Sequence, residues 1–394
     1  MRQRRLYSDQ LGPLPAFMLD GTEDVVSVEA PTGDKVWLVR DYALGRQVLT
    51  DSRFSRSEAV KARAPKFIPV QPVPESMMSR DGSEHARLRR VVMGAFSASR
   101  IAALAPTVER QANEHIDRLL AMGPPADLIE GLALPLSLGV LCSLLGVPPQ
   151  DGDHFCHLVE ELFDITDGSV REKTERRIKL VAYMTGLIAR KRQQPDDDLL
   201  TRMVQAHDRG DLSLSELITM GLTLLMAGYE TTAAQIGLSA LAVLSDPNEY
   251  ERLRRRPASL PAAVDELLRL TPAAPVSFAR VAREAVELNG VTVAAGEAVV
   301  VSVLHGNRDK VAFTGSENHA GERRPVPHLT FGHGVHRCPG ASLATLQVRI
   351  ALDLLLRRFA NLRLAAGPAE PVVWKEGLLT RGLSRLLVEW DAPQ

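Results

Sequence analysis

The alternation of apolar and polar residues along the chain predicts a mainly α-helical protein with small β-sheets. Apolar residues recur at three- and four-residue spacing, with polar faces between them, over residues 84–121, 126–147, 153–192 and 197–207. Runs rich in β-forming residues are confined to about 25–45, 284–304 and 384–390. The first of these contains a Pro-Thr-Gly-Asp turn between two short runs, which predicts a hairpin. The sequence has no internal repeat and no low-complexity linker, so we expect residues 1–394 to form a single domain.

One predicted helix is unusually long. Ser213 and Glu216 fit a capping box, and the apolar pattern continues to Ser245-Asp246-Pro247, where proline ends it. At 1.5 Å per residue this helix would be roughly 48 Å long and would cross the whole protein. Inside it lies AGYETT, residues 227–232, where Glu230 and two threonines interrupt the apolar run. Gly228 lowers helix propensity by about 1 kcal/mol, so we expect the helix to be weak at this point.

A second helix is predicted from near Pro261 to Thr271-Pro272. It carries Glu266 and Arg269, which are three residues apart and therefore share one face, where they can form an ion pair.

Composition and charge exclude several classes of protein. The chain has 47 basic and 48 acidic residues and a net charge of −1, so no global field attracts nucleic acid or an anionic membrane. The basic start MRQRRLYSDQ is not followed by the apolar run of a secretory signal. The apolar stretch Leu132–Val147 contains Pro135 and is expected to be a buried helix. Cys142, Cys156 and Cys338 are too few for a disulfide framework, which is typical of a reducing compartment. We therefore expect a cytoplasmic protein with no nucleic-acid or membrane partner.

Residues 331–344, FGHGVHRCPGASLA, place one cysteine at the start of a helical pattern. The amides and dipole of a helix N-terminus stabilise a thiolate, so the pKa of Cys338 is expected to be lowered. From these residues alone, Cys338 can be a buried apolar residue, a nucleophile with His336 as its base, or a metal ligand. The absence of a C-x-x-C pattern argues against zinc. Gly332 and Gly334 would let the backbone approach a large flat group such as haem.

The loop FGHGVHRCPG resembles the cysteine-ligand loop of the cytochrome P-450 haem-thiolate monooxygenases, of the soluble bacterial, actinobacterial-like type. Four further motifs occur in the order found in that family: HARLRR at 85–90, AGYETT at 227–232, ELLR at 266–269 and NRD at 307–309. The resemblance extends from about residue 25 to the C-terminus. It implies the triangular cytochrome P-450 fold, mainly α with small β-sheets, with a long central helix over the haem.

The resemblance also implies the haem site. Cys338 would be the axial thiolate ligand of haem b (iron protoporphyrin IX), and thiolate donation favours O–O cleavage. The next residue, Pro339, has no N–H, so only Gly340 and later amides can donate to the sulfur. The haem-carboxylate contacts would be His85, Arg89, Arg280 and His336. The other haem-binding positions would be Ala227, Gly228, Phe331, Gly332 and Gly340. Without the resemblance, HARLRR would be interpreted as a solvated basic helix face.

Glu230 and Thr231 match the acid–alcohol pair of the family. By resemblance, the hydroxyl of Thr231 would stabilise the iron-bound oxygen and the carboxylate of Glu230 would relay protons. The alternative for Thr231 is a hydrogen bond to its own helix.

Glu266 and Arg269 match a buried structural pair of the family. Relatives usually have Asp-Arg-Phe-Asp before the cysteine loop, whereas this chain has Glu317-Asn318-His319-Ala320. Asn318 or His319 would have to replace the missing partner, so we expect a less stable haem-side core.

The resemblance implies a substrate cavity walled by residues 57–80, 153–195, 275–278 and 378–380, with Thr223 and Ala227 facing it. The implied reaction is hydroxylation or epoxidation of a small, mostly apolar molecule, for which we expect a secondary metabolite such as a polyketide or macrolide.

Dioxygen and two electrons from a ferredoxin and its ferredoxin reductase would drive this reaction. The ferredoxin would dock near Arg337, Arg349 and the Arg87–Arg90 cluster, and we expect a monomer. The alternatives are oxidative bond formation without oxygen insertion, and a haem-binding sensor without catalysis.

Overall fold

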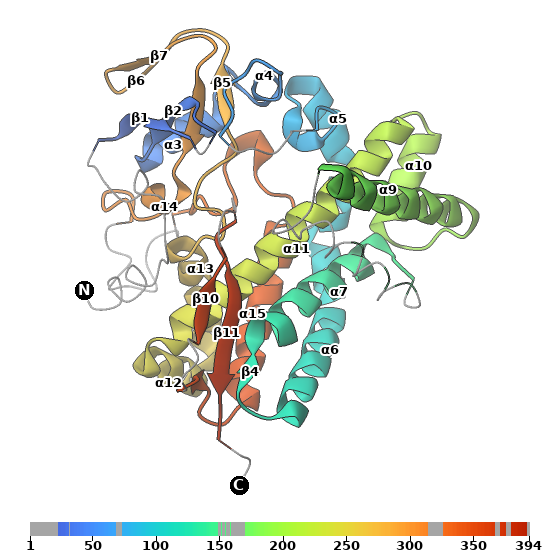
Figure 1. Ribbon diagram of the computed structural model, residues 1–394, viewed down its shortest axis with the longest axis vertical. Helices are drawn as coiled ribbons and strands as arrows, with labels where there is room; N and C mark the ends of the chain where they lie inside the picture. Colours follow the sequence, from blue (N-terminus) through green and yellow to red (C-terminus); the bar gives the residue numbers. More distant parts are fainter. Residues whose placement is uncertain are drawn as a thin grey trace.

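The computed structural model describes residues 23–30, 32–67, 73–148, 170–313, 326–366, 371–375 and 380–391, together with residues 151, 154 and 158. Its central element is α11 (Leu214–Leu244), a helix of 31 residues that crosses the molecule diagonally in Figure 1. The predicted capping box is present: the N–H of Glu216 donates to Ser213 Oγ at 3.1 Å, and the N–H of Ser213 donates to Glu216 Oε2 at 2.9 Å. Every residue from Thr232 to Leu244 is buried, because neighbouring helices cover this half of α11.

The helices pack around α11 and against one another. Helices α7 and α15 contact α11 directly, and α15 also packs on α6. The helices of this part are α5 (Gly82–Met93), α6 (Ala98–Met122), α7 (Leu134–Leu145), α9 (Val170–Gln193), α10 (Leu199–Asp208), α12 (Pro247–Arg255), α13 (Leu260–Leu270) and α15 (Ala341–Arg358). Three short helices, α3 (Tyr42–Thr50), α4 (Arg56–Ala59) and α14 (Val303–Gly306), lie nearer the β-rich part. One continuous apolar core joins the helical part, as the sequence pattern predicts.

The sequence expectation for residues 126–147 is wrong at its start. Ala126–Asp127 form strand β4, and Ile129–Ala133 form a π-helical turn before α7 begins. The side chain of Asp127 accepts hydrogen bonds from the N–H of Ile129 and the N–H of Leu386, so strand pairing overrides the helical pattern there. Of the predicted helix 153–192, the structure describes α9; most of 153–169 lies outside the described residues.

The β-rich segments form three small sheets. The largest has the strand order β1-β2-β8-β5-β3, and the predicted hairpin supplies its antiparallel β1–β2 pair. Strand β2 then pairs in parallel with β8, with Leu38 opposite Val300, so the N-terminal hairpin joins a strand from the last third of the chain. The bounds are β1 (Val25–Glu29), β2 (Lys35–Val39), β3 (Phe54–Ser55), β5 (Arg280–Ala282) and β8 (Ala298–Val301).

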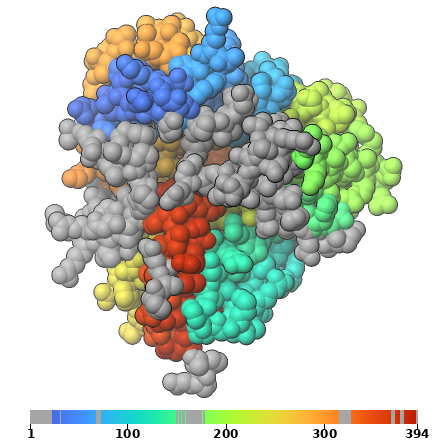
Figure 2. Space-filling view, viewed as in Figure 1, coloured from blue at the N-terminus to red at the C-terminus, as the bar shows by residue number. Residues whose placement is uncertain are grey.

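The second sheet has the order β10-β11-β4, with β9 also paired to β11. Its strands are β9 (Arg363–Leu364), β10 (Val372–Trp374) and β11 (Leu383–Glu389) beside β4. In Figure 2 the red C-terminal segment lies side by side with the turquoise segment that contains β4, in agreement with the pairing of β11 and β4. Strands β6 (Val286–Leu288) and β7 (Val291–Val293) form a separate hairpin.

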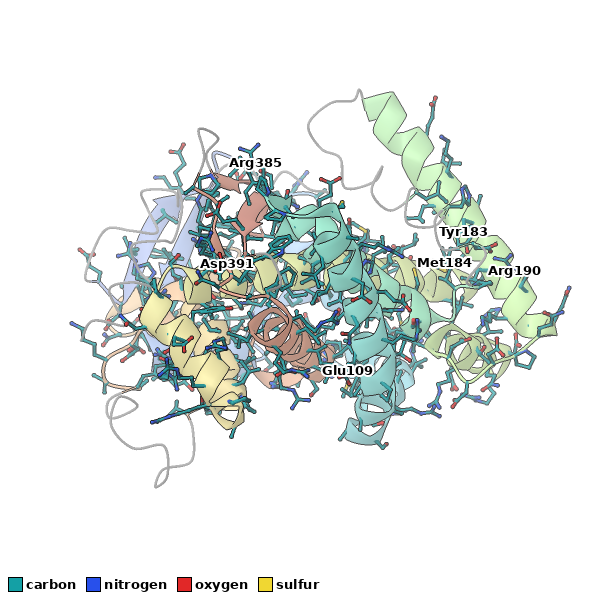
Figure 3. The ribbon with its side chains drawn as sticks, turned by 90° about the horizontal axis from the view of Figure 1, so that it is seen from below. Glu109, Tyr183, Met184, Arg190, Arg385 and Asp391 are labelled. Carbon is teal, nitrogen blue, oxygen red and sulfur yellow. The ribbon has the colours of Figure 1, made fainter. Side chains whose placement is uncertain are left out.

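Helix α9 shows how the outer helices attach to the centre. Figure 3 labels Tyr183, Met184 and Arg190 on this helix. Met184 is fully buried, and its sulfur lies 3.1 Å from the position that a Cβ on Gly221 of α11 would occupy. The Arg190 guanidinium lies over the Tyr183 ring, 5.8 Å from its centroid. Glycine at position 221 therefore allows α9 to pack closely against α11.

Within the described residues, none of the helices has by itself the length and apolar character of a membrane span. The bent pair Gly82–Phe96 and Ala98–Met122, at 50° to each other, meets those criteria only when taken together.

Candidate active site

The cysteine loop is a tight turn that leads into α15. Gly332 and Gly334 have φ values of +70° and +73°, which favour glycine. A Cβ on Gly334 would lie 2.7 Å from the carbonyl oxygen of Leu49 in α3, so no side chain fits there. The N–H of Cys338 donates to the carbonyl of Phe331 at 2.8 Å and closes the loop. The glycines of this motif therefore place the cysteine against the N-terminal part of the chain.

The cysteine sulfur has a distinct electrostatic environment. Burial raises the pKa of the Cys338 thiol, so the expected lowering is wrong for the protein alone. The amides of Gly340 and Ala341 and the charges of Arg337 and Arg89 act in the opposite direction. As predicted, the amides that reach the sulfur begin at Gly340. A cation bonded to the sulfur would hold it as a thiolate against the cost of burial.

A cluster of histidine and arginine side chains lies beside this loop. His85 on α5 is 3% exposed, and its ring centroid is 4.1 Å from that of His336. Arg280 on β5 is 5% exposed, and Arg89 Nη2 donates to the carbonyl of Arg337 at 2.7 Å. The structure thus brings together the four residues predicted to contact the haem carboxylates.

Burial strongly affects the charge of this cluster. It lowers the pKa of Arg280 to about 10, and burial together with the charge of Arg280 lowers the pKa of Arg56 to about 10. Burial, then His336 and Arg89, lowers the pKa of His85 to about 4. Among the described residues, Arg280 Nε and His336 Nε2 are buried without a hydrogen-bond partner. A buried arginine cation with an unused donor requires an anionic ligand, and the carboxylates of a haem meet that requirement.

Asp81 is a residue of this site that the sequence analysis did not single out. Its carboxylate accepts hydrogen bonds from Ser55 Oγ at 2.5 Å, Ser57 N at 2.9 Å and Arg56 N at 3.1 Å. His336 Nε2 lies 3.6 Å away. Although burial opposes it, the interactions with His336, Ser55 and Ser57 hold the pKa of Asp81 far below its usual range. From the sequence, Asp81 would be identified only as the N-cap residue of α5. Its side chain does not make the hydrogen bond that such a cap usually makes.

Helix α11 carries the predicted acid–alcohol pair. Thr231 Oγ1 donates to the carbonyl of Ala227 at 2.5 Å, the helix hydrogen bond that was the alternative interpretation. Glu230 Oε1 pairs with Lys375 Nζ at 3.2 Å, a contact that no motif indicated. Ala227 is exposed, so it leaves an open surface one turn before Thr231.

The structure gives Gly228 a packing role. A Cβ at this position would lie 2.8 Å from Leu141 Cδ2 of α7, so the close contact of α7 and α11 requires glycine. The helix is continuous here. Ser137 Oγ of α7 supports it by donating to the carbonyls of Tyr229 at 2.7 Å and Gly228 at 3.2 Å.

The Glu266–Arg269 pair is present, but it is not a buried pair. Arg269 is 4% exposed, whereas the Glu266 side chain is 43% exposed, and Arg269 Nε donates to Glu266 Oε2 at 2.8 Å. Arg269 also donates to the carbonyl of Asn307, from the NRD motif, and Asn307 Nδ2 donates back to the Arg269 carbonyl at 2.9 Å. Asn307 therefore completes this network. Asn318 and His319, the expected substitutes, lie outside the described residues.

Part of the expected substrate wall can be placed. Ser76 Oγ and Thr223 Oγ1 are 3.3 Å apart, which joins the 57–80 segment to α11. Phe278 is 52% exposed, and the Arg56 guanidinium lies 5.1 Å from its ring centroid. Leu378 lies outside the described residues, as do residues 68–72.

Comparison with known proteins agrees with this fold. The family model for cytochrome P450 matches residues 137–371, more than half of the chain. The chain is 40% identical over 374 residues to mycinamicin IV hydroxylase/epoxidase of Micromonospora griseorubida, covering 94% of each protein. It is 39% identical to nocardicin C N-oxygenase of Nocardia uniformis subsp. tsuyamanensis, again over 94% of each.

Solved structures show the same architecture. The mixed-function P450 MycG superimposes with a TM-score of 0.87 at 39% identity, over 96% of this chain and 97% of that one. The LnmA hydroxylase of the leinamycin biosynthetic pathway of Streptomyces atroolivaceus gives a TM-score of 0.85 at 41% identity, over 97% of each chain. The chain belongs to the cytochrome P450 family. It is a P450 monooxygenase of the bacterial type whose cofactor is haem b, and the mainly α fold expected from its motifs is confirmed.

Proposed function

We propose that this enzyme inserts one oxygen atom of dioxygen into a C–H or C=C bond of a small, mostly apolar secondary metabolite with a polyketide or macrolide skeleton. The observation that carries the proposal is the Glu230–Thr231 pair on α11, in the same chain as the Cys338 loop. The proposal is supported by relatives that are named for hydroxylation, epoxidation and N-oxygenation of mycinamicin IV and nocardicin C.

The residues near the cysteine loop have binding roles in this proposal. Cys338 would hold the iron, while His85, Arg89, Arg280 and His336 would hold the carboxylates. Held by the thiolate of Cys338, the haem would supply the activation of dioxygen and the cleavage of the O–O bond. Exposed Ala227 would leave room for the cofactor beside α11.

The residues on α11 would deliver protons while the site excludes bulk water. Thr231 Oγ1 donates to its own helix in this structure, so it has to turn away from the Ala227 carbonyl to donate to the reacting oxygen. Glu230 follows as the next proton carrier, because its carboxylate can take up and release a proton near the hydroxyl. Exposed Phe278 and the Ser76–Thr223 contact would form part of the substrate wall.

Electrons would arrive from a ferredoxin and its reductase at the surface near Cys338. Arg90, Arg337 and Arg349 are exposed and available for such docking. Arg87 is engaged elsewhere, because it pairs with Glu216 at 2.6 Å and with Glu84 at 2.9 Å. A positive surface would mainly raise the association rate of an acidic partner.

The test is a substrate screen followed by isotope labelling. Macrolides, other polyketides and non-ribosomal peptides are added to the ferric enzyme, and compounds that shift the haem absorption are turned over with ferredoxin and reductase under ¹⁸O₂. One ¹⁸O atom per product molecule supports the proposal. Ligand binding without substrate-dependent consumption of reductant would contradict it and indicate a sensor.

A second candidate is oxidative bond formation without oxygen insertion. It is favoured by the likeness to SgvP, a putative thioether synthase of griseoviridin tailoring, at 35% identity and a TM-score of 0.86. In the same experiment, a product that has lost two hydrogen atoms and carries no ¹⁸O would identify this reaction.

A further inference from the structure

The carboxylate of Glu230 has a charged partner that comes from near the C-terminus of the chain. Lys375 follows strand β10, and its Nζ lies 3.2 Å from Glu230 Oε1. The side chains are 25% and 14% exposed, so the pair is only partly open to water. Figure 1 shows β10 and β11 crossing in front of α11, and β11 contacts α11. The C-terminal sheet therefore places an ammonium group on the acid of the acid–alcohol pair.

The backbone around Lys375 is built to hold it there. The N–H of Lys375 donates to the carbonyl of Gly382 at 3.0 Å, next to the Trp374–Leu383 position of the β10–β11 ladder. A Cβ on Gly382 would lie 3.0 Å from Ala234 Cβ and 3.9 Å from Lys375 Cδ. Glycine at this position thus lets the segment just before β11 lie closely against Ala234 of α11.

The helix presents matching positions to this strand. Glu230 and Ala234 are four residues apart and share one face of α11, so the strand that packs on Ala234 brings Lys375 onto Glu230. Thr231, the next residue along the helix, donates its hydrogen bond to the carbonyl of Ala227. None of the contacts among the described residues joins Thr231 to Lys375. The ion pair therefore fixes the acid and leaves the alcohol free to turn.

We propose that Lys375 is a positioning residue for proton delivery. Its ammonium holds the Glu230 carboxylate on the side of the C-terminal sheet and defines where that carboxylate starts each transfer. Glu230 takes up one proton from water and releases one proton toward Thr231, so Lys375 is not consumed. The inference rests on the relay role proposed for Glu230. Because a partly exposed ion pair adds little to stability, the position of this pair is better explained by the carboxylate that it orients.

The first test uses carbon monoxide bound to the reduced haem as a probe of the field on the α11 side. The infrared C–O stretch is recorded for the wild type, Lys375→Met, Glu230→Gln and the double variant. We expect Lys375→Met to shift the band, and the shift to disappear in the Glu230→Gln background. A band unchanged by Lys375→Met, or a shift that persists in the Glu230→Gln background, would overturn the inference.

The second test measures oxygen uptake driven by ferredoxin and reductase, in H₂O and in D₂O. General acid–base catalysis contributes about 10²–10⁴-fold, so Glu230→Gln should slow uptake about 10²-fold, and Lys375→Met should slow it about tenfold with a larger solvent isotope effect. Lys375→Arg, which keeps the charge, should stay within about twofold of the wild type. Lys310→Met removes the same charge at an exposed position and should change neither rate nor isotope effect.

The outcomes separate this inference from the proposed function. Normal uptake by Glu230→Gln would reject the relay itself and the role of Lys375 with it. Slow oxygen uptake by Glu230→Gln together with normal uptake by Lys375→Met would reject only the positioning role. An equal loss in Lys375→Met and Lys375→Arg, without a change in isotope effect, would indicate a packing role and overturn the inference. The absorption of the reduced carbon monoxide complex confirms that each variant is folded with haem.

Discussion

The rings of His85 and His336 lie with their centroids 4.1 Å apart, although one belongs to α5 and the other to the cysteine loop. Arg89 strengthens this junction one helical turn later, because its guanidinium donates to the carbonyl of Arg337. Helix α5 and the cysteine loop are thus joined at two points around the place where the haem carboxylates would bind.

Asp81 should be important for the stability of this junction. We expect Asp81→Asn to lower the free energy of unfolding by about 2–4 kcal/mol, since it removes a charge that accepts several partly buried hydrogen bonds. Denaturation of the haem-loaded protein by urea measures this loss. Glu84→Gln is the matched control: its side chain is 54% exposed and pairs with Arg87, so it should cost only about 0.5 kcal/mol.

The same variant should change the pH dependence of stability. The pKa of Asp81 is lower in the folded protein than its usual value of about 3.9, so the ionised group stabilises the fold above about pH 4. This contribution is lost as the pH falls below that value. Unfolding free energies measured between pH 3 and 6 should therefore fall less steeply toward acid in Asp81→Asn. Equal slopes in the two proteins would contradict this.

Thr231→Ala should uncouple the reaction. Without the hydroxyl, protons reach the bound oxygen without control, and we expect most of the reducing equivalents to appear as hydrogen peroxide. The ratio of peroxide to NAD(P)H oxidised measures this effect, and Thr231→Ser should restore most of the coupling because it retains the donor. Coupling that stays intact in Thr231→Ala would remove this residue from the relay.

Pro339→Leu should raise the reduction potential of the haem. The amides that reach the sulfur of Cys338 begin at Gly340, and leucine would add an N–H one residue earlier. A further donor to the thiolate withdraws electron density from the iron and favours the reduced state. Spectroelectrochemical titration measures the shift, and a potential that does not rise would count against a role for this proline.

The Glu266–Arg269 pair should respond unequally to substitution. Glu266→Gln should lower the free energy of unfolding by only about 1 kcal/mol. The Glu266 side chain is 43% exposed, and Arg269 keeps its hydrogen bond to the Asn307 carbonyl. Arg269→Met should cost about 3–5 kcal/mol, because it disrupts a buried network. The Arg269 guanidinium also lies 4.7 Å from the centroid of the Phe313 ring. Urea denaturation of both variants tests this order, and equal losses would mean that the pair acts as a unit.

The sequence was most informative where the chemistry is local. The capping box at Ser213, the proline after α11 and the hairpin of β1 and β2 depend on neighbouring residues, and all were predicted correctly. Cys338 was identifiable because glycines with positive φ and a helix start occur within a few residues of it.

The missed features depend on contacts between distant segments. Asp81 resembles an ordinary helix cap until Ser55 and His336 are placed around it. The Lys375–Glu230 contact requires the C-terminal sheet to lie on α11, a packing that no local pattern encodes. Likewise, the pKa of Cys338 depends on how deeply the loop is buried, which outweighs the local effect of the helix start.

Gly334 contacts the carbonyl oxygen of Leu49, so the loop that holds the cysteine is shaped against a helix made near the beginning of the chain. During synthesis, that helix leaves the ribosome long before residues 331–340 exist. The surface that receives the cofactor can form only when nearly the whole polypeptide has been released. We therefore expect haem capture to be one of the last events in the maturation of this enzyme, and chains terminated before residue 338 cannot retain haem through Cys338.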